Sequence, residues 1–145
     1  MFRTLTDEDL QPIVESGLEP KAYRFVNIAL NIMLVSKIQY GLNKVSPLHD
    51  RKLNGFDLIQ IMRYTGASFY GMLAPCVMRR WGIFNDSVVH GIVAFLFILN
   101  GVDTKNEILN RNCYTESHVL VPVENMDELE SFDGFIQQLG SSFLE

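Results

Sequence analysis

The sequence lacks the common residue patterns of metal sites and of nucleophilic catalysis. Its two cysteines and three histidines form neither Cys-x-x-Cys nor His-Glu-x-x-His, the spacings that gather zinc ligands. No glycine-rich loop leads into Lys-Ser or Lys-Thr, which excludes a P-loop, and no serine stands in a Gly-x-Ser-x-Gly elbow. We therefore predict no catalytic residue, no metal and no cofactor.

Long apolar runs are also missing. No stretch reaches the roughly 20 apolar residues that cross a bilayer, so no membrane segment is expected. Met1-Phe2-Arg3 leads into acidic residues instead of the apolar core of a signal peptide. Two cysteines without export features are typical of a reducing compartment, so we expect a cytoplasmic protein with free thiols. Cys76, within an apolar run, is expected to be buried.

The most apolar part of the chain lies between Asn85 and Gly101. It has ten apolar residues among the twelve from 88 to 99 and no charge among them. Asn85 is a suitable N-cap, and Asn100-Gly101 is typical of a helix end. This pattern predicts a central helix over 85–100 that is buried on nearly every side. The predicted structural core around it comprises Trp81, Gly82, Ile92, Val93 and Leu96.

Capping residues, prolines and glycines divide the earlier part of the chain. They predict a short helix from Thr6 to Gly17, a long one from Pro20 to about Gly41, and a third that begins at Asn54. Gly66, Gly71 and Pro75 predict a break, followed by a short helix that ends at Trp81-Gly82.

Beyond Gly101 the pattern changes. Alternating valines over 116–123 are typical of a strand, with 107–114 as the nearest partner, so we predict a minor β element near 107–123. Asn125 starts an amphipathic pattern with Leu129, Phe132, Ile136 and Leu139. The predicted fold is mainly α: one globular domain over 1–145, with five or six helices. Its core spans 20–102, and an acidic extension over 116–145 packs on that core.

Charge is unevenly distributed along the chain, whose net charge is −5. Residues 21–82 carry nine basic residues (Lys or Arg) and two acidic ones. Residues 1–20 carry one basic and five acidic residues, and residues 83–145 carry two basic and ten acidic residues. The distribution favours pairing of the acidic ends with the basic middle. The alternative is an exposed basic face that meets an anionic partner.

Several short segments resemble the Minf family of small bacterial proteins of unknown function. They cover roughly residues 20–102 and fall in the same order. The segments are Ala22-Tyr23-Arg24-Phe25-Val26, Asn54-Gly55-Phe56-Asp57-Leu58-Ile59, Tyr70-Gly71-Met72-Leu73-Ala74, Trp81-Gly82-Ile83 and Gly91-Ile92-Val93. This chain has Asn54-Gly55-Phe56-Asp57 where the family usually shows Thr-Gly-Gln-Glu. The resemblance implies a related fold and a bacterial cytoplasmic setting, and it implies no activity.

Three classes of function are compatible with these observations. A non-enzymatic protein-binding or regulatory module comes first because catalytic patterns are absent, with a homodimer as a further expectation. A winged-helix-like nucleic-acid binder comes second. Its DNA-recognition helix would be 86–99, which is apolar and disfavours this class. Because fifteen acidic residues elsewhere in the chain can face the basic middle, the intact chain is predicted to bind no nucleic acid. The third class is a small-anion binder or enzyme that uses Arg63, Arg79 and Arg80.

Overall fold

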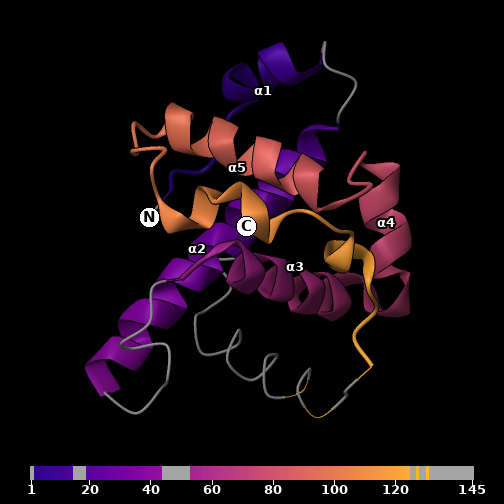
Figure 1. Cartoon of the computed structure of the whole chain (residues 1–145). Helices are drawn as coiled ribbons and strands as arrows, with labels where there is room; N and C mark the ends of the chain where they lie inside the picture. Colours follow the sequence, from indigo (N-terminus) through magenta and orange to yellow (C-terminus); the bar gives the residue numbers. More distant parts are fainter. Residues whose placement is uncertain (1, 15–18, 44–52, 125–126, 128–129, 131–145) are drawn as a thin grey trace.

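Five α-helices and four short 3-10 helices form the part of the chain that the computed structural model describes, residues 2–14, 19–43, 53–124, 127 and 130 (Figure 1). The mainly α prediction is confirmed. The α-helices are α1 (Asp7–Val14), α2 (Pro20–Asn43), α3 (Gly55–Tyr70), α4 (Ala74–Arg80) and α5 (Asp86–Leu99). The 3-10 helices are η1 (Gly71–Leu73), η2 (Glu107–Leu109), η3 (Arg111–Cys113) and η4 (His118–Leu120).

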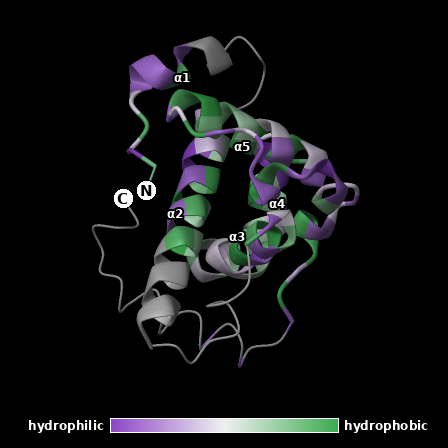
Figure 2. Cartoon of the chain, turned by 60° about the vertical axis from the view of Figure 1, so that its left-hand side comes forward, coloured by the Kyte–Doolittle hydropathy of each residue, from purple (hydrophilic) through white to green (hydrophobic). Residues whose placement is uncertain are grey.

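Helices α2 and α3 pack against each other, and α4, η1, η2 and η4 pack on α3. Helix α2 is the longer of the two. It contacts α1, α3 and α5, and Figure 1 shows it running obliquely through the molecule. Hydrophobic stretches lie on α2, α3 and α5, whereas α1 is mainly hydrophilic (Figure 2). The side chains of α2 that are fully buried in the core are Ala22, Val26, Ala29, Leu30, Ile32 and Met33.

Local side-chain caps explain where three of the helices begin. Thr6 and Asp9 exchange side-chain and backbone hydrogen bonds at the start of α1. Asn54 and Asp57 form the same reciprocal capping box at α3. Asn85 accepts from the backbone N–H of Val88 at α5. These caps lie where the sequence predicts them.

Helix α5 is buried along one side and is not enclosed as predicted. Val89, Ile92, Val93, Leu96 and Phe97 are buried, but Ser87, Gly91 and Ile98 are exposed. Ile98 is 69% exposed. The exposed Ser87, Gly91 and Ile98 are spaced four and seven positions apart and so share one face of the helix, whose burial the apolar composition overestimated.

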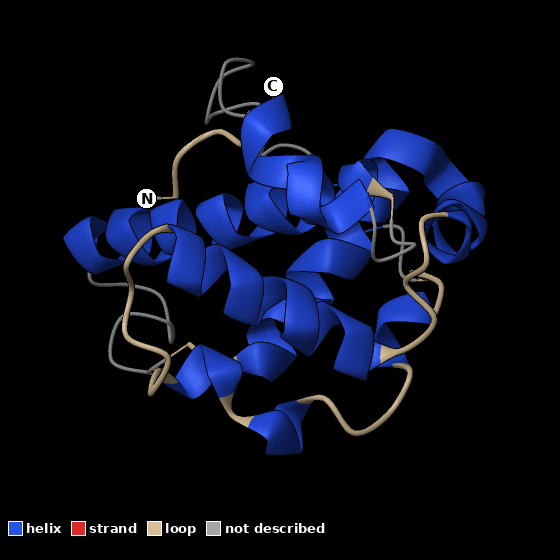
Figure 3. Cartoon of the chain, turned by 90° about the horizontal axis from the view of Figure 1, so that it is seen from above, coloured by secondary structure: helices blue, strands red, loops and turns tan. Residues whose placement is uncertain are grey.

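The predicted β element near 107–123 is wrong. Among the described residues this region holds 3-10 turns joined by loops and no strand (Figure 3). Asn106 and Asn110 accept hydrogen bonds from the backbone two residues on, at Ile108 and Asn112. Such local bonds compete with a strand ladder and favour turns.

The start of the predicted acidic extension packs on the core. Residues 118–120 contact α3 and α4. The amphipathic helix predicted from Asn125 lies outside the described residues, which include only Asp127 and Glu130 of that segment. Among the described helices, none combines the length and the apolar character that crossing a membrane requires.

Candidate functional site

The most distinctive surface feature lies at the corner between α3 and α4. Helix α3 ends at Tyr70, and Gly71 reverses the chain with φ of 61°, a conformation that favours glycine. The helices approach each other closely behind the corner, since a Cβ on Gly66 would lie 3.2 Å from Ala74 Cβ. Gly66 and Gly71 therefore have packing and turn roles, as their lack of a P-loop context suggests.

A cavity of about 470 Å³ opens at this corner, between α3, η1, α4 and residues 119–124. We call it the groove. Its lining is mainly apolar, with Arg63 and Glu124 as its charged members. The lining residues are Arg63, Ala67, Gly71, Met72, Ala74, Pro75, Met78, Val119, Val121, Pro122, Val123 and Glu124.

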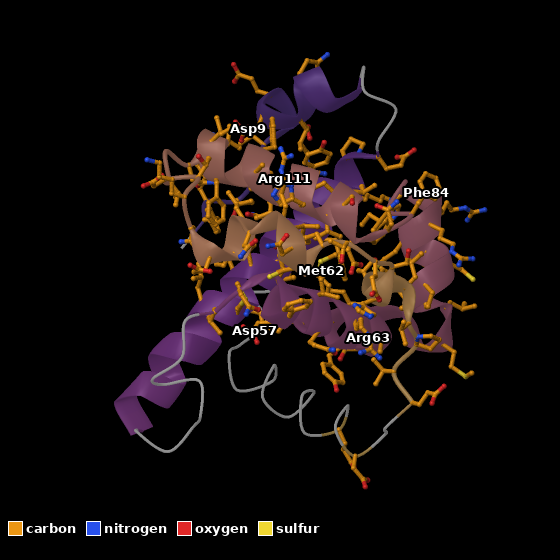
Figure 4. The ribbon with its side chains drawn as sticks, in the orientation of Figure 1. Asp9, Asp57, Met62, Arg63, Phe84 and Arg111 are labelled. Atoms are coloured by element: carbon orange, nitrogen blue, oxygen red, sulfur yellow. The ribbon has the colours of Figure 1, made fainter. Side chains whose placement is uncertain are left out.

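Arg63 joins the two walls of the groove. Its Nε donates to the carbonyl of Val121 at 2.8 Å, and its Nη2 donates to the carbonyl of Pro122 at 3.0 Å. Its Nη1 donates to Oε1 of Gln60 at 2.7 Å. Figure 4 shows Arg63 on α3 beside this segment. The guanidinium group thus holds residues 121–122 in place as one wall.

Exposed apolar side chains lie at the α3–α4 corner and on the loop wall, and two of them, Met72 and Val121, also line the groove. We call them the corner patch: Phe69, Tyr70, Met72, Leu73 and Val121. Met72 is 95% exposed and Leu73 is 65% exposed, although both are large apolar residues. Contiguous apolar surface of this kind is typical of an interaction site.

The two aromatic residues of the corner patch contact buried aromatic side chains. The ring of Tyr70 contacts Trp81 at a centroid distance of 5.7 Å, and Phe69 contacts Phe25 at 6.5 Å. Trp81 and Phe25 also contact each other and are buried. These contacts fix the position of the patch relative to the core.

Only one of the three arginines of the predicted anion site lines the groove. Arg63 does, whereas Arg79 and Arg80 are exposed in the last turn of α4 and do not contribute to its lining. Arg63 is already bonded to three neutral acceptors. A shared anion site on these residues therefore stays a prediction.

The same loop segment is held at its other end by Asp86. This carboxylate is fully buried and accepts from the backbone N–H groups of Val119 at 2.9 Å and His118 at 3.2 Å. The backbone N–H of Asp86 donates to the carbonyl of Glu116. Burial raises the pKa of Asp86, against the lowering effect of these two donors and of the nearby His118 imidazole.

A second cavity, of about 420 Å³, has a more polar lining of Ser87, His90, Arg111, Tyr114 and Thr115. Its candidate catalytic groups are engaged. Ser87 Oγ donates to the Tyr114 carbonyl, and His90 Nε2 lies 3.0 Å from the Leu109 carbonyl. The Tyr114 hydroxyl donates to the Ile108 carbonyl, and burial raises its pKa. These bonds attach the loop to α5 and leave no nucleophile paired with a base.

The remaining candidate residues have ordinary surroundings. Cys76 is exposed, contrary to the expectation of a buried thiol, because it lies on the outer side of α4; Cys113 is buried. The described residues contain no group of three or more side chains suited to a metal ion. Of the predicted structural core, Trp81, Ile92, Val93 and Leu96 are buried, and Gly82 is partly buried at a turn with φ of 97°.

The sequence did not indicate the groove or the buried hydrogen bonds from residues 118–119 to Asp86. Asp86 reads as an ordinary acidic residue in the first turn of a helix, and only the fold shows that it is buried. Met72-Leu73 directly after Gly71 was the available signal for the corner patch, because a turn places such residues at the surface.

Comparisons with known proteins give no match. No protein-family model matches this chain, and no significant match is found among curated proteins or among solved structures. The resemblance to the Minf family stays a prediction.

Proposed function

We propose that this protein is a non-enzymatic, cytoplasmic binding module that holds an apolar segment of a partner protein in the groove. The observation that carries the proposal is the corner patch beside an apolar cavity. Met72 and Leu73 are the most exposed of its members, and Met72 and Val121 also line the groove. A flexible methionine suits a surface that adapts to its partner.

The size of the groove fits more than one side chain. An apolar cavity of roughly 150 Å³ accommodates a benzene molecule. A groove of about 470 Å³ therefore has room for two or three apolar side chains of a partner. Anchors that fill a pocket of this kind provide most of the affinity of an interface.

The observations give less support to the other two classes. The polar groups of the second cavity are bonded within the protein, which disfavours an enzyme. The apolar surface of α5, with Ile98 exposed, disfavours contact with phosphates, so we continue to expect no nucleic-acid binding.

The test is selection from a random peptide library displayed on phage, against the wild-type chain and two variants. Met72→Glu/Leu73→Glu places charges at the mouth of the groove. Ile98→Glu is the matched control, because Ile98 is about as exposed as Leu73 but lies on α5, outside the groove. We expect peptides with apolar residues one helical turn apart, bound by wild type and Ile98→Glu and not by the double variant.

Two results would contradict this proposal. One is equal recovery of peptides by all three proteins, which would place the binding surface elsewhere. The other is a wild-type dimer in sedimentation that the double variant abolishes, without any selected peptide. That outcome would assign the groove to a second copy of the chain, in line with the alternative of a homodimer.

A further inference from the structure

We infer that the partner presents a carboxylate beside its apolar anchor, and that Arg63 binds this carboxylate at the edge of the groove. The inference rests on the proposed function and specifies the chemistry of the partner. It concerns a protein segment with an acidic side chain close to a leucine-like or phenylalanine-like one.

The hydrogen bonds of Arg63 to the described residues do not use all of its N–H donors. A guanidinium has five N–H donors, and the three described bonds use one on Nε, one on Nη1 and one on Nη2. None of the described residues bonds to the second N–H on either Nη. A guanidinium can donate through two of its N–H groups to the two oxygens of a carboxylate.

None of the described hydrogen-bond acceptors of Arg63 carries a negative charge. Two are backbone carbonyls and the third is the amide oxygen of Gln60, so all three are neutral. The cation therefore lies at the edge of a mainly apolar cavity. When a partner covers the groove and excludes water, an acidic neighbour of its anchor would pair with this cation.

The surrounding sequence favours the same sign of charge on the partner. Residues 58–85, all of them described, contain Arg63, Arg79 and Arg80 and no acidic residue. Glu124 is the one acidic residue among the described residues that line the groove, and it is exposed. A basic residue beside the anchor would face Arg63 in the groove, with Arg79 and Arg80 adding positive charge on α4 outside it, which disfavours a basic partner segment.

The experiment uses two designed helical peptides that differ in one residue. Each has Leu and Phe one helical turn apart, with acetylated and amidated ends; one has Glu between them and its twin has Gln. Fluorescence anisotropy measures the dissociation constant of each for the wild-type chain, Arg63→Gln and Arg111→Gln. Arg111 is an exposed arginine outside the groove and serves as the matched control.

We expect wild type and Arg111→Gln to bind the Glu peptide about fivefold more tightly than the Gln peptide, a preference that decreases with salt. In Arg63→Gln the two affinities should become equal. The ratio of the two dissociation constants distinguishes loss of the carboxylate contact from loosening of the wall at 121–122. Loosening of the wall would weaken the binding of both peptides by the same factor and leave the ratio unchanged.

Three outcomes would overturn the inference. Equal affinities in wild type would remove the carboxylate contact and leave the proposed function standing, provided that Met72→Glu/Leu73→Glu abolishes binding. If Arg63→Gln kept the wild-type preference for the Glu peptide, Arg63 would serve only to hold residues 121–122 in place. Absence of binding by either peptide to wild type at millimolar concentration would contradict both this inference and the proposed function.

Discussion

Asp86 and Arg63 attach the same loop segment, residues 116–124, to the helical bundle, and they do so in opposite environments. Asp86 is fully buried and accepts two backbone N–H groups from the loop. Arg63 lies at the rim of the groove and donates to two backbone carbonyls of the loop. One attachment is inside the protein, and the other faces solvent.

Because Asp86 is buried and Arg63 faces solvent, we expect Asp86 to matter for folding stability and Arg63 for the proposed binding. A buried carboxylate with its donors in place contributes to folding, and its loss leaves unpaired groups where water cannot reach. A solvent-facing guanidinium contributes little to folding, since water replaces its bonds, but it remains accessible to a partner. Substitutions at the two positions should therefore affect different measurements.

A substitution in the apolar core should cause the largest loss of folding stability. Leu96→Ala should lower the free energy of unfolding by roughly 2–5 kcal/mol, because it opens a cavity at a fully buried position on α5. Ile98→Ala, at the exposed side of the same helix, should change it by less than about 0.5 kcal/mol. Urea denaturation measures both. Equal effects of the two substitutions would show that the burial of α5 is assigned to the wrong side.

Removal of the buried attachment should have the next largest effect. Asp86→Ala leaves the N–H groups of His118 and Val119 without their acceptor, at a cost of roughly 1–3 kcal/mol each. Relief from burying a charge offsets part of this, so the expected net loss is about 2 kcal/mol. An unchanged unfolding midpoint would mean that residues 116–119 are not held by this carboxylate.

The pH dependence of stability tests the same attachment with a smaller change. Because the pKa of Asp86 is raised above 3.8 in the folded protein, the folded state binds this proton more tightly than the unfolded state. Relative to Asp86→Asn, the wild type should therefore gain stability as pH falls through the folded-state pKa, with the gain complete below 3.8. The reverse trend would show that the two backbone donors outweigh burial.

Asp9 does not interfere with that measurement. Its hydrogen bonds with the Arg3 side chain and the Thr6 backbone lower its pKa to about 2. Its contribution to stability is present above its ordinary pKa of 3.8 and is lost only as pH falls from 3.8 to about 2. Because Asp9 is present in both the wild type and Asp86→Asn, its contribution cancels in the difference between them.

The solvent-facing attachment should have the smallest effect on folding. Arg63→Gln is expected to change the free energy of unfolding by less than about 1 kcal/mol, because its bonds are accessible to water. Chemical denaturation measures this, with Asp86→Ala as the comparison. A loss as large as that of Asp86→Ala would make Arg63 a structural residue and remove the distinction between the two attachments.

The helices could be predicted because their signals are local. Asn54, Asn85 and Thr6 cap the backbone within three residues of their own positions, so the sequence alone indicates where α3, α5 and α1 begin. The break at Gly71 and the short helix before Trp81 follow from the same kind of local chemistry.

The surroundings of α5 and the loop could not be predicted in this way. Ile98 and Ile92 look alike in sequence, and only the directions of the neighbouring helices decide which is covered. Residues 116–123 alternate like a strand, but a strand needs a partner. In the expected partner, 107–114, Asn106 and Asn110 favour turns instead. The groove arises from the meeting of α3, α4 and residues 119–124, which are distant in sequence.

One wall of the groove is a loop, so the shape of the groove can change independently of the helical bundle. Residues 121–124 contribute part of the lining but belong to no helix. Loops accept substitutions, insertions and deletions more readily than the helices that they connect. Sequence change there would alter the shape and charge of the groove while α2, α3 and α5 stay packed. Under the proposed function, substitutions confined to this loop would change which segment the groove accepts without changing the bundle.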